Sequence, residues 1–217
     1  MELIIALAIL ILSIIAHEVA HGYAADTLGD PTARYAGRLT LNPLPHIDLM
    51  GSVLIPALLI FTHSPILFGW AKPVPYNPHN LSGRWSETVV ASAGVATNLA
   101  LALIFGLIVR FGSTPLATGG TALGAEALSI GATIVFVNLF LGLFNLIPFP
   151  PLDGFTVLRS VLPWHRARML HLFEAQMRGA GVITLILFIL VFSYVLAGPF
   201  FNFVSWLFSL ITGGLVY

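Results

Sequence analysis

The sequence predicts an all-α, multi-pass membrane protein with about five to six transmembrane helices, a re-entrant or broken segment, and a small β-hairpin or sheet near its functional site. Of its 217 residues, 58% are hydrophobic and only 8% are charged, far below the roughly 25% of an average soluble domain. The mean hydropathy is +0.96. Long apolar runs alternate with short segments rich in proline and glycine, which predicts bilayer-crossing helices joined by irregular connections.

The first expected span runs from Leu3 to about Ala25. A helix of roughly 23 residues is about 35 Å long at 1.5 Å per residue, which is enough to cross a bilayer with some tilt. A secretory signal peptide would begin with a positive region and end at an A-x-A cleavage site. This run begins with Met1-Glu2 and contains no such site, so we expect it to be retained as a membrane anchor.

The connection over residues 26–50 is expected to hold the short strands, because turn sequences such as Gly29-Asp30-Pro31 separate β-compatible residues. Two prolines interrupt the next apolar run, residues 51–69. We therefore expect a re-entrant or broken segment there, and a complete crossing is the alternative. The prolines of residues 70–78 then favour extended backbone.

The later spans are expected over Glu87 to Phe111, Ala127 to about Phe149, Val182 to Ala197 and Phe200 to about Val216, with an interfacial helix from Arg159 to Arg178. We divide the chain into a membrane core, residues 1–154, and a C-terminal part, residues 155–217, which holds the interfacial helix and the closing spans. Within the core the expected parts are a metal motif (17–21), a re-entrant region (26–85), two spans (87–111 and 127–149) and a final motif (145–154).

The positions of the basic residues predict that the N-terminus lies outside. With Glu2 outside, one basic residue, Arg110, falls on the outer side. The remaining basic residues then lie on the cytoplasmic side: Arg34, Arg38, Lys72, Arg84, Arg159, Arg166, Arg168 and Arg178. This agrees with the positive-inside rule, provided that residues 51–69 do not cross completely.

The apolar N-terminal run contains His17-Glu18-Val19-Ala20-His21. Residues four apart share one face of a helix, so His17 and His21 can bind the same metal ion. This is the HExxH pattern, in which two histidines bind Zn²⁺ and the glutamate acts as a general base. Ionisable residues inside so apolar a run are costly and indicate a functional site.

A third metal ligand has to come from elsewhere, because catalytic zinc sites usually have three protein ligands. The chain has no cysteine, which leaves His, Asp and Glu. Asp153 is the best candidate, since it follows a proline-rich break at the end of a span expected to run inward, on the same side as His21. Asp153 is also a candidate helix cap, and the two roles are compatible. For His46 and Asp48, surface hydrogen bonding is favoured over an accessory metal pair.

These motifs together resemble the site-2 protease family of intramembrane zinc metalloproteases. The resemblance rests on His17 to Gly22, on Asn145-x-x-Pro148-x-Pro150-x-x-Asp153-Gly154, and on Gly94-Val95-Ala96-Thr97-Asn98, which resembles the family's GxxxN element. Gly69 to Val74 resembles a loop of its compact prokaryotic members. No PDZ insertion and no C-terminal regulatory domain is evident in the sequence.

The resemblance implies an intramembrane zinc endopeptidase in a prokaryotic cell membrane, acting on transmembrane protein or peptide substrates. It implies one Zn²⁺ per chain held by His17, His21 and Asp153, with Glu18 activating a water molecule at the zinc. Asn98 and Asn145 would bind the substrate backbone or the oxyanion. The alternative is a non-proteolytic membrane protein, either a pseudoprotease or a metal transporter that uses the same residues. The balance of nine basic and nine acidic residues gives no indication of a nucleic-acid partner, and the sequence does not indicate an oligomeric state.

Overall fold

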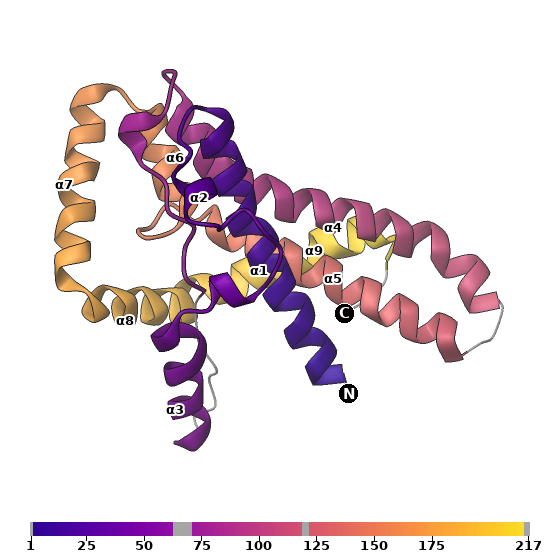
Figure 1. Cartoon of the computed structure of the whole chain (residues 1–217). Helices are drawn as coiled ribbons and strands as arrows, with labels where there is room; N and C mark the ends of the chain where they lie inside the picture. The colour runs from indigo at the N-terminus through magenta and orange to yellow at the C-terminus, as the bar shows by residue number, and fades with distance from the viewer. Residues whose placement is uncertain (1, 63–70, 119–121, 215–217) are drawn as a thin grey trace.

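A computed structural model describes residues 2–62, 71–118 and 122–214 (Figure 1). The described residues form nine α-helices: α1 (Glu2–Thr27), α2 (Thr32–Tyr35), α3 (Ile55–Phe61), α4 (Ser86–Thr118), α5 (Ala122–Asn145), α6 (Asp153–Val161), α7 (Trp164–Ala180), α8 (Val182–Val191) and α9 (Ala197–Thr212). Short helical turns of other types lie at Leu44–His46, Leu49–Leu54, Pro78–Asn80 and Phe192–Leu196.

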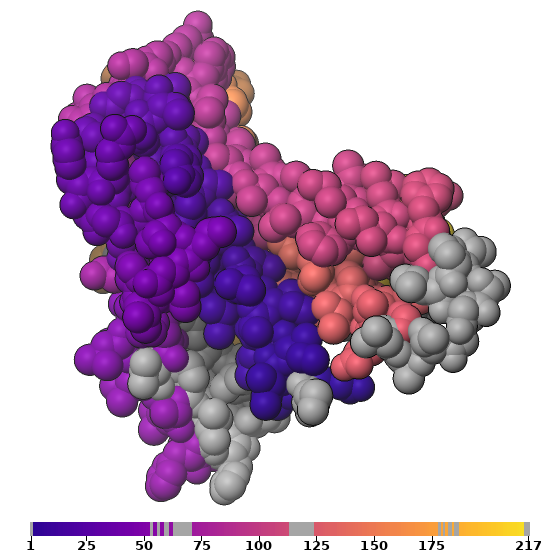
Figure 2. Space-filling model, turned by 45° about the vertical axis from the view of Figure 1, so that its right-hand side comes forward, coloured from indigo at the N-terminus to yellow at the C-terminus, as the bar shows by residue number. Residues whose placement is uncertain are grey.

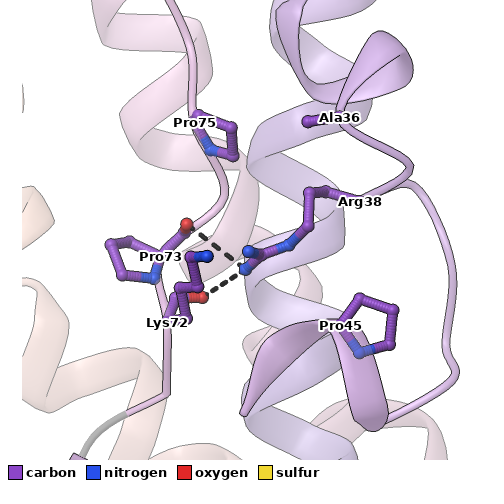
Figure 3. Close-up of a pocket in the computed structure, with 6 residues that line it drawn as sticks. All are labelled: Ala36, Arg38, Pro45, Lys72, Pro73 and Pro75. Atoms are coloured by element: carbon purple, nitrogen blue, oxygen red, sulfur yellow. Dashed lines mark hydrogen bonds between the residues drawn. The ribbon is translucent and has the colours of Figure 1, made fainter. Parts of the chain in front are cut away.

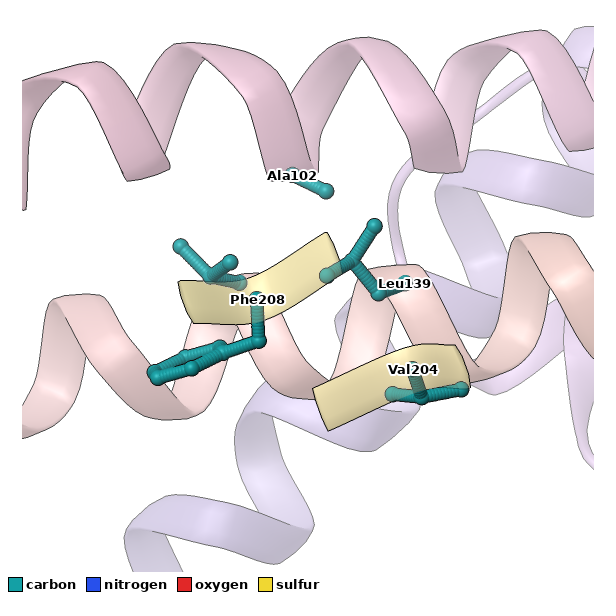
Figure 4. Packing of buried hydrophobic residues seen from close by; sticks show 5 residues of the cluster. Ala102, Leu139, Val204 and Phe208 are labelled. Carbon is teal, nitrogen blue, oxygen red and sulfur yellow. The ribbon is translucent and has the colours of Figure 1, made fainter. Parts of the chain in front are cut away.

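Helices α1, α4, α5 and α9 make up the central bundle. Helix α4 packs along α5, α1 packs against both, and α9 packs against α4 and α5 (Figure 1). A buried apolar cluster joins α4, α5 and α9, with Ala102, Leu139, Val204 and Phe208 meeting between the three helices (Figure 4). Burial of such side chains holds helices together mainly through close packing, since a lipid surround is itself apolar.

Four helices are long and apolar enough to cross a bilayer: Glu2–Thr27, Ser86–Gly112, Gly124–Asn145 and Leu187–Thr212. The prediction of a multi-pass membrane protein is therefore confirmed, but the prediction of about five to six spans is wrong for the described residues. The difference arises at the C-terminus, where the two expected closing spans form one continuous helical segment. Pro199 is the third residue of α9, a first-turn position where proline is tolerated, and a π-helical turn at Phe192–Leu196 precedes α9.

The predicted small β-hairpin or sheet near the functional site is also wrong, since the described residues contain no strand. Residues 71–77 are extended, but Pro73 and Pro75 lack the N–H donors that a strand ladder needs. One backbone bond, from Lys72 N to His46 O at 2.9 Å, joins this segment to the preceding loop. Side chains bind four more of its backbone groups: Glu18 and Asp30 accept from Val74 N and Asn77 N, and Arg38 donates to the carbonyl oxygens of Lys72 and Pro73. These bonds take the place of part of a strand ladder.

The region expected to be re-entrant is described only in part. Residues 51–62 contain the end of a π-helical turn and α3, which at about 10 Å is too short to cross a bilayer. Residues 63–70, which include Pro65 of the predicted segment, lie outside the described residues. Figure 2 shows one face of the molecule, most of which comes from the N-terminal half of the chain.

Candidate metal centre

Three side chains that could bind a metal meet where the second half of α1 faces the start of α6. His17 and His21 lie one turn apart on α1, and Asp153 is the first residue of α6. The Asp153 Oδ2 atom lies 3.0 Å from His17 Nε2 and 3.3 Å from His21 Nε2. One donor atom from each residue lies within 4.8 Å of the other two. The structure thus brings together the three residues predicted as ligands, although Asp153 is 136 positions from His17.

The spacing of these donor atoms fits a zinc ion. Zinc bonds of about 2.0–2.2 Å in a tetrahedral site place neighbouring donors roughly 3.3 Å apart. The separations from Asp153 Oδ2 to the Nε2 atoms of the two histidines, 3.0 and 3.3 Å, are close to this value. Two imidazoles and a carboxylate are also a typical donor set for a zinc site that leaves a position open for water or substrate.

Asp153 is placed by a sharp bend in the chain. Residues 146–152 connect α5 to α6, and a Cβ atom at Gly154 would lie only 2.1 Å from the carbonyl oxygen of Leu146. Only glycine allows this close approach of backbone to backbone. The N-cap position of α6 is Leu152, so the Asp153 carboxylate does not cap the helix and is free to face the histidines.

The Asp153 carboxyl is ionised at neutral pH. Burial raises its pKa, but the interactions with His17 and His21 outweigh burial and hold the pKa at about 2. An ionised carboxylate is the form that binds a metal ion.

The Nδ1 atom of each histidine has its own partner on α4. His17 Nδ1 lies 2.5 Å from Asn98 Oδ1, and His21 Nδ1 lies 2.7 Å from the carbonyl oxygen of Val90. A metal-binding histidine typically donates its second ring N–H in this way, which fixes the ring and leaves the other nitrogen free to bind the metal. Asn98, expected to contact substrate, is fully buried behind His17.

Helix α4 approaches the two imidazoles unusually closely at Gly94. A Cβ atom at this position would lie 2.5 Å from His21 Nε2 and 2.6 Å from His17 Nε2. Gly94 and Asn98 are four residues apart and so lie on the same face of the helix. The spacing of the Gly-x-x-x-Asn element therefore places a small residue against the Nε2 atoms of both histidines and a hydrogen-bond acceptor behind one ring.

Glu18 contacts the extended segment formed by residues 71–77, which we call the strap. The strap passes next to α1 at this point. The Glu18 Oε2 atom accepts a hydrogen bond of 2.8 Å from Val74 N. Val74 is buried, and its side chain lies near Gly22, where a Cβ atom would come within 2.9 Å of Val74 Cγ1. The strap thus holds one carboxylate oxygen of Glu18 beside the histidines.

Two residues without a predicted role at the site, Arg38 and Asp30, hold the strap in place. The Arg38 Nη2 atom donates to the carbonyl oxygens of Lys72, at 2.5 Å, and Pro73, at 3.3 Å. Arg38 is 5% exposed and borders a cavity of 330 Å³ between the strap and the preceding loop (Figure 3). Further along, the fully buried Asp30 accepts from Asn77 N at 2.5 Å.

Asp30 has further donors in Thr32 and in the Asn80 side chain. Burial raises the pKa of this carboxyl, but the hydrogen bonds from Thr32, Asn77 and Asn80 hold it below its ordinary value. Neither Arg38 nor Asp30 has a motif signature, because their partners are backbone groups far away in the sequence. The one sequence signal was their charge within or beside apolar surroundings.

Asn145 is not brought to the three ligands by any described contact. Its amide nitrogen donates to the carbonyl oxygen of Leu141, one turn back on α5, at 2.9 Å. His46 is buried, and its Nε2 atom lies 2.9 Å from the carbonyl oxygen of Thr40. Asp48 accepts from Gly51 N at 2.7 Å, so both residues serve local turns.

Apolar helices that enclose two histidines and a carboxylate, with the glutamate of an HExxH motif beside them, define a polytopic membrane metalloprotein. Comparison with known proteins identifies its family. The profile of Peptidase family M50 matches residues 112–192. "Putative zinc metalloprotease YwhC" of Bacillus subtilis is 40% identical over 186 residues, which cover 83% of this chain and 78% of that protein.

"Putative zinc metalloprotease Rip2" of Mycolicibacterium smegmatis is 31% identical over 200 residues, covering 92% of this chain and 71% of that protein. The chain belongs to Peptidase family M50, the site-2 protease family. No solved structure matches it. The resemblance predicted from the motifs is confirmed, and with it a protease whose cofactor is zinc.

Proposed function

We propose that this protein is an intramembrane zinc endopeptidase that hydrolyses peptide bonds of transmembrane proteins or peptides. The observation that carries the proposal is the meeting of His17, His21 and Asp153 beside Glu18 on a helix apolar enough to span a bilayer. Membership of the family supports proteolysis, and the position of the site within α1 supports cleavage at the level of the membrane.

In this proposal His17, His21 and Asp153 hold the Zn²⁺ ion. Bound there, zinc supplies a Lewis acid that polarises the peptide carbonyl and lowers the pKa of water. The protein's own contribution is to fix the three donors. The Nδ1 bonds of both histidines and the bend at Gly154 keep them in place before any substrate arrives.

Glu18 is the proposed general base. It takes the proton from the attacking water and gives it to the leaving nitrogen as the peptide bond breaks. The bond from Val74 N holds its Oε2 atom, which leaves Oε1 to face the water. A carboxylate held at one oxygen is oriented for proton transfer through the other.

Asn145 is the proposed contact for the substrate backbone or the oxyanion, as the family resemblance implies. It is the last residue of α5 and is partly exposed, and the loop that it begins ends at Asp153. For the orientation of the chain we propose an N-terminus outside and a multi-pass arrangement in a prokaryotic cell membrane. Cleavage would then release fragments toward the cytoplasm.

The proposal is tested with purified full-length protein and a tagged single-span membrane substrate. Glu18→Gln keeps the size and hydrogen-bonding capacity of the side chain while removing its basicity, so cleavage is expected to fall by a factor of about 100 or more, within the range attributed to general acid–base catalysis. Zinc content should stay at the wild-type level. The matched control is Glu126→Gln, which makes the same change at an exposed residue of α5 and should cleave normally. Wild-type rates in Glu18→Gln would refute the assignment of the base.

A further inference from the structure

A chain of buried polar side chains extends from the metal centre into the apolar bundle. Asn98 on α4 and Asn138 on α5 are fully buried, and Ser13 on α1 is 5% exposed. The amide nitrogen of Asn98 donates to Asn138 Oδ1 at 2.8 Å, and the amide nitrogen of Asn138 donates to Ser13 Oγ at 2.9 Å. Three helices thus contribute one polar residue each to a network that ends at His17.

Two backbone carbonyls fix the direction of both amides in this network. Asn138 Nδ2 also donates to the carbonyl oxygen of Ile134 at 2.9 Å, and Asn98 Nδ2 lies 3.4 Å from that of Ser13. A carbonyl oxygen only accepts hydrogen bonds, so each amide has to present its nitrogen there. Asn138 Oδ1 is therefore directed to Asn98 Nδ2, and Asn98 Oδ1 to His17.

The direction of the Asn98 amide determines which nitrogen of His17 carries the proton. Because Asn98 presents an oxygen at 2.5 Å, Nδ1 has to be the donor, and Nε2 keeps its lone pair for the metal. A reversed amide would place an N–H group against the N–H of Nδ1, and its single oxygen against two other oxygens, Asn138 Oδ1 and Ser13 O. These buried groups would then have no hydrogen-bond partner, which strongly disfavours the reversed amide.

We propose that Ser13 and Asn138 are positioning residues that orient Asn98 and thereby hold His17 in its metal-binding tautomer. The inference deepens the proposed function, since it concerns the same zinc site. It differs from a simple role in helix packing, where buried asparagines add interhelical hydrogen bonds of modest strength. A packing role affects the stability of the bundle, whereas a positioning role affects the affinity of the site for zinc.

The test measures the Kd of zinc for full-length protein in detergent, by competition with a chromophoric chelator, alongside thermal unfolding. Asn138→Leu is expected to raise the zinc Kd about tenfold, the lower end of the 10–100-fold range typical when the support of a metal-binding histidine is removed. Ser13→Ala, a smaller change that still leaves Asn138 its bond to Ile134, should raise it in the same direction by less. The matched control is Asn202→Leu, at an exposed position of α9, which should leave the Kd unchanged.

A second background separates positioning from packing. In Asn98→Asp, the carboxylate presents an oxygen to His17 in either direction and needs no orienting partner. Adding Asn138→Leu to that background should therefore change the Kd by less than about twofold. The inference would be overturned if Asn138→Leu raised the zinc Kd by the same factor in the wild-type and Asn98→Asp backgrounds. It would also be overturned if Asn138→Leu and Ser13→Ala both bound zinc with the wild-type Kd. The readout is zinc binding and not cleavage. If the expected Kd changes were found but the protein cleaved no substrate, the proposed function would be refuted and this inference would stand.

Discussion

Gly94→Ala adds one methyl group to α4 at its closest approach to the metal centre. The new Cβ atom would lie 2.5 Å from His21 Nε2, 2.6 Å from His17 Nε2 and 2.7 Å from His17 Cδ2. Ordinary contacts between such atoms are about 3.5 Å, so each imidazole would have to retreat by about 1 Å. Neither ring is free to do so, because Asn98 and Val90 hold the Nδ1 atoms.

The expected consequence is a large loss of zinc affinity. Inserting a methyl group into a well-packed site typically costs about 1–3 kcal/mol. At 1.4 kcal/mol per factor of ten, this corresponds to a zinc Kd raised roughly 5- to 100-fold if the strain falls on the metal-bound form. Cleavage of a membrane substrate should fall by at least as much when zinc is limiting.

The matched control is Gly106→Ala, three turns further along α4, where a Cβ atom would lie 2.2 Å from Ile211 Cγ2 on α9. Both variants crowd the same helix, but only Gly94→Ala crowds the histidines. Zinc Kd and thermal unfolding are measured for each. If Gly94→Ala binds zinc as tightly as wild type, or if both variants lose affinity equally, the close approach of α4 does not shape the metal site.

Three further predictions concern the supports of the site. Gly154→Ala should reduce zinc affinity and cleavage together, because the new Cβ atom would clash with the backbone carbonyl of Leu146, which cannot move aside as a side chain could. Unchanged zinc content would contradict this. Arg38→Met should lower cleavage several-fold at an unchanged zinc Kd, since it frees the strap but touches no proposed ligand; cleavage at the wild-type rate would show that the strap does not depend on it. Folding lowers the pKa of Asp30. The stability that Asp30 contributes is therefore complete above the pKa of the unfolded state, about 3.9, and is lost as the pH falls through the pKa of the folded state. Asp30→Asn should therefore be less stable than wild type at pH 7, by about 2 kcal/mol in the free energy of unfolding. Thermal unfolding should show this difference shrinking between pH 5 and pH 3. A difference that stays the same across that range would contradict the prediction.

The cluster of His17, His21 and Asp153 was predictable because its parts have local signatures. His17 and His21 are related by helical spacing, and Asp153 directly follows a proline-rich break at the end of an apolar span. The network behind His17 was not predictable, because Ser13 and Asn138 are isolated polar residues in apolar helices. Their partners depend on how three helices pack, which spacing within one helix does not reveal. An asparagine seven residues before Asn145, and so on nearly the same face of the helix, was the one available hint.

The incorrect predictions about the fold, a β-hairpin and two separate closing spans, have a similar origin. Extended backbone in the strap follows from its prolines, but whether an extended segment pairs with a strand depends on distant groups. Here Arg38, Glu18 and Asp30 bind backbone groups that a neighbouring strand would otherwise bind. At the C-terminus, Gly198-Pro199 signals a helix break, yet a proline in the first turn of α9 is compatible with a continuous segment.

With the proposed ligands, the distance in sequence between His17 and Asp153 would make the metal a reversible cross-link as well as a cofactor. A metal bound to both closes a loop of more than half of the chain, and an unfolded chain does not offer that site preformed. Zinc at 1,000 times its Kd would stabilise the folded protein by about 4.1 kcal/mol through mass action alone. A newly inserted chain would therefore gain much of its resistance to unfolding only when α1 and α6 first share an ion, which makes metal supply a step in the assembly of the protein.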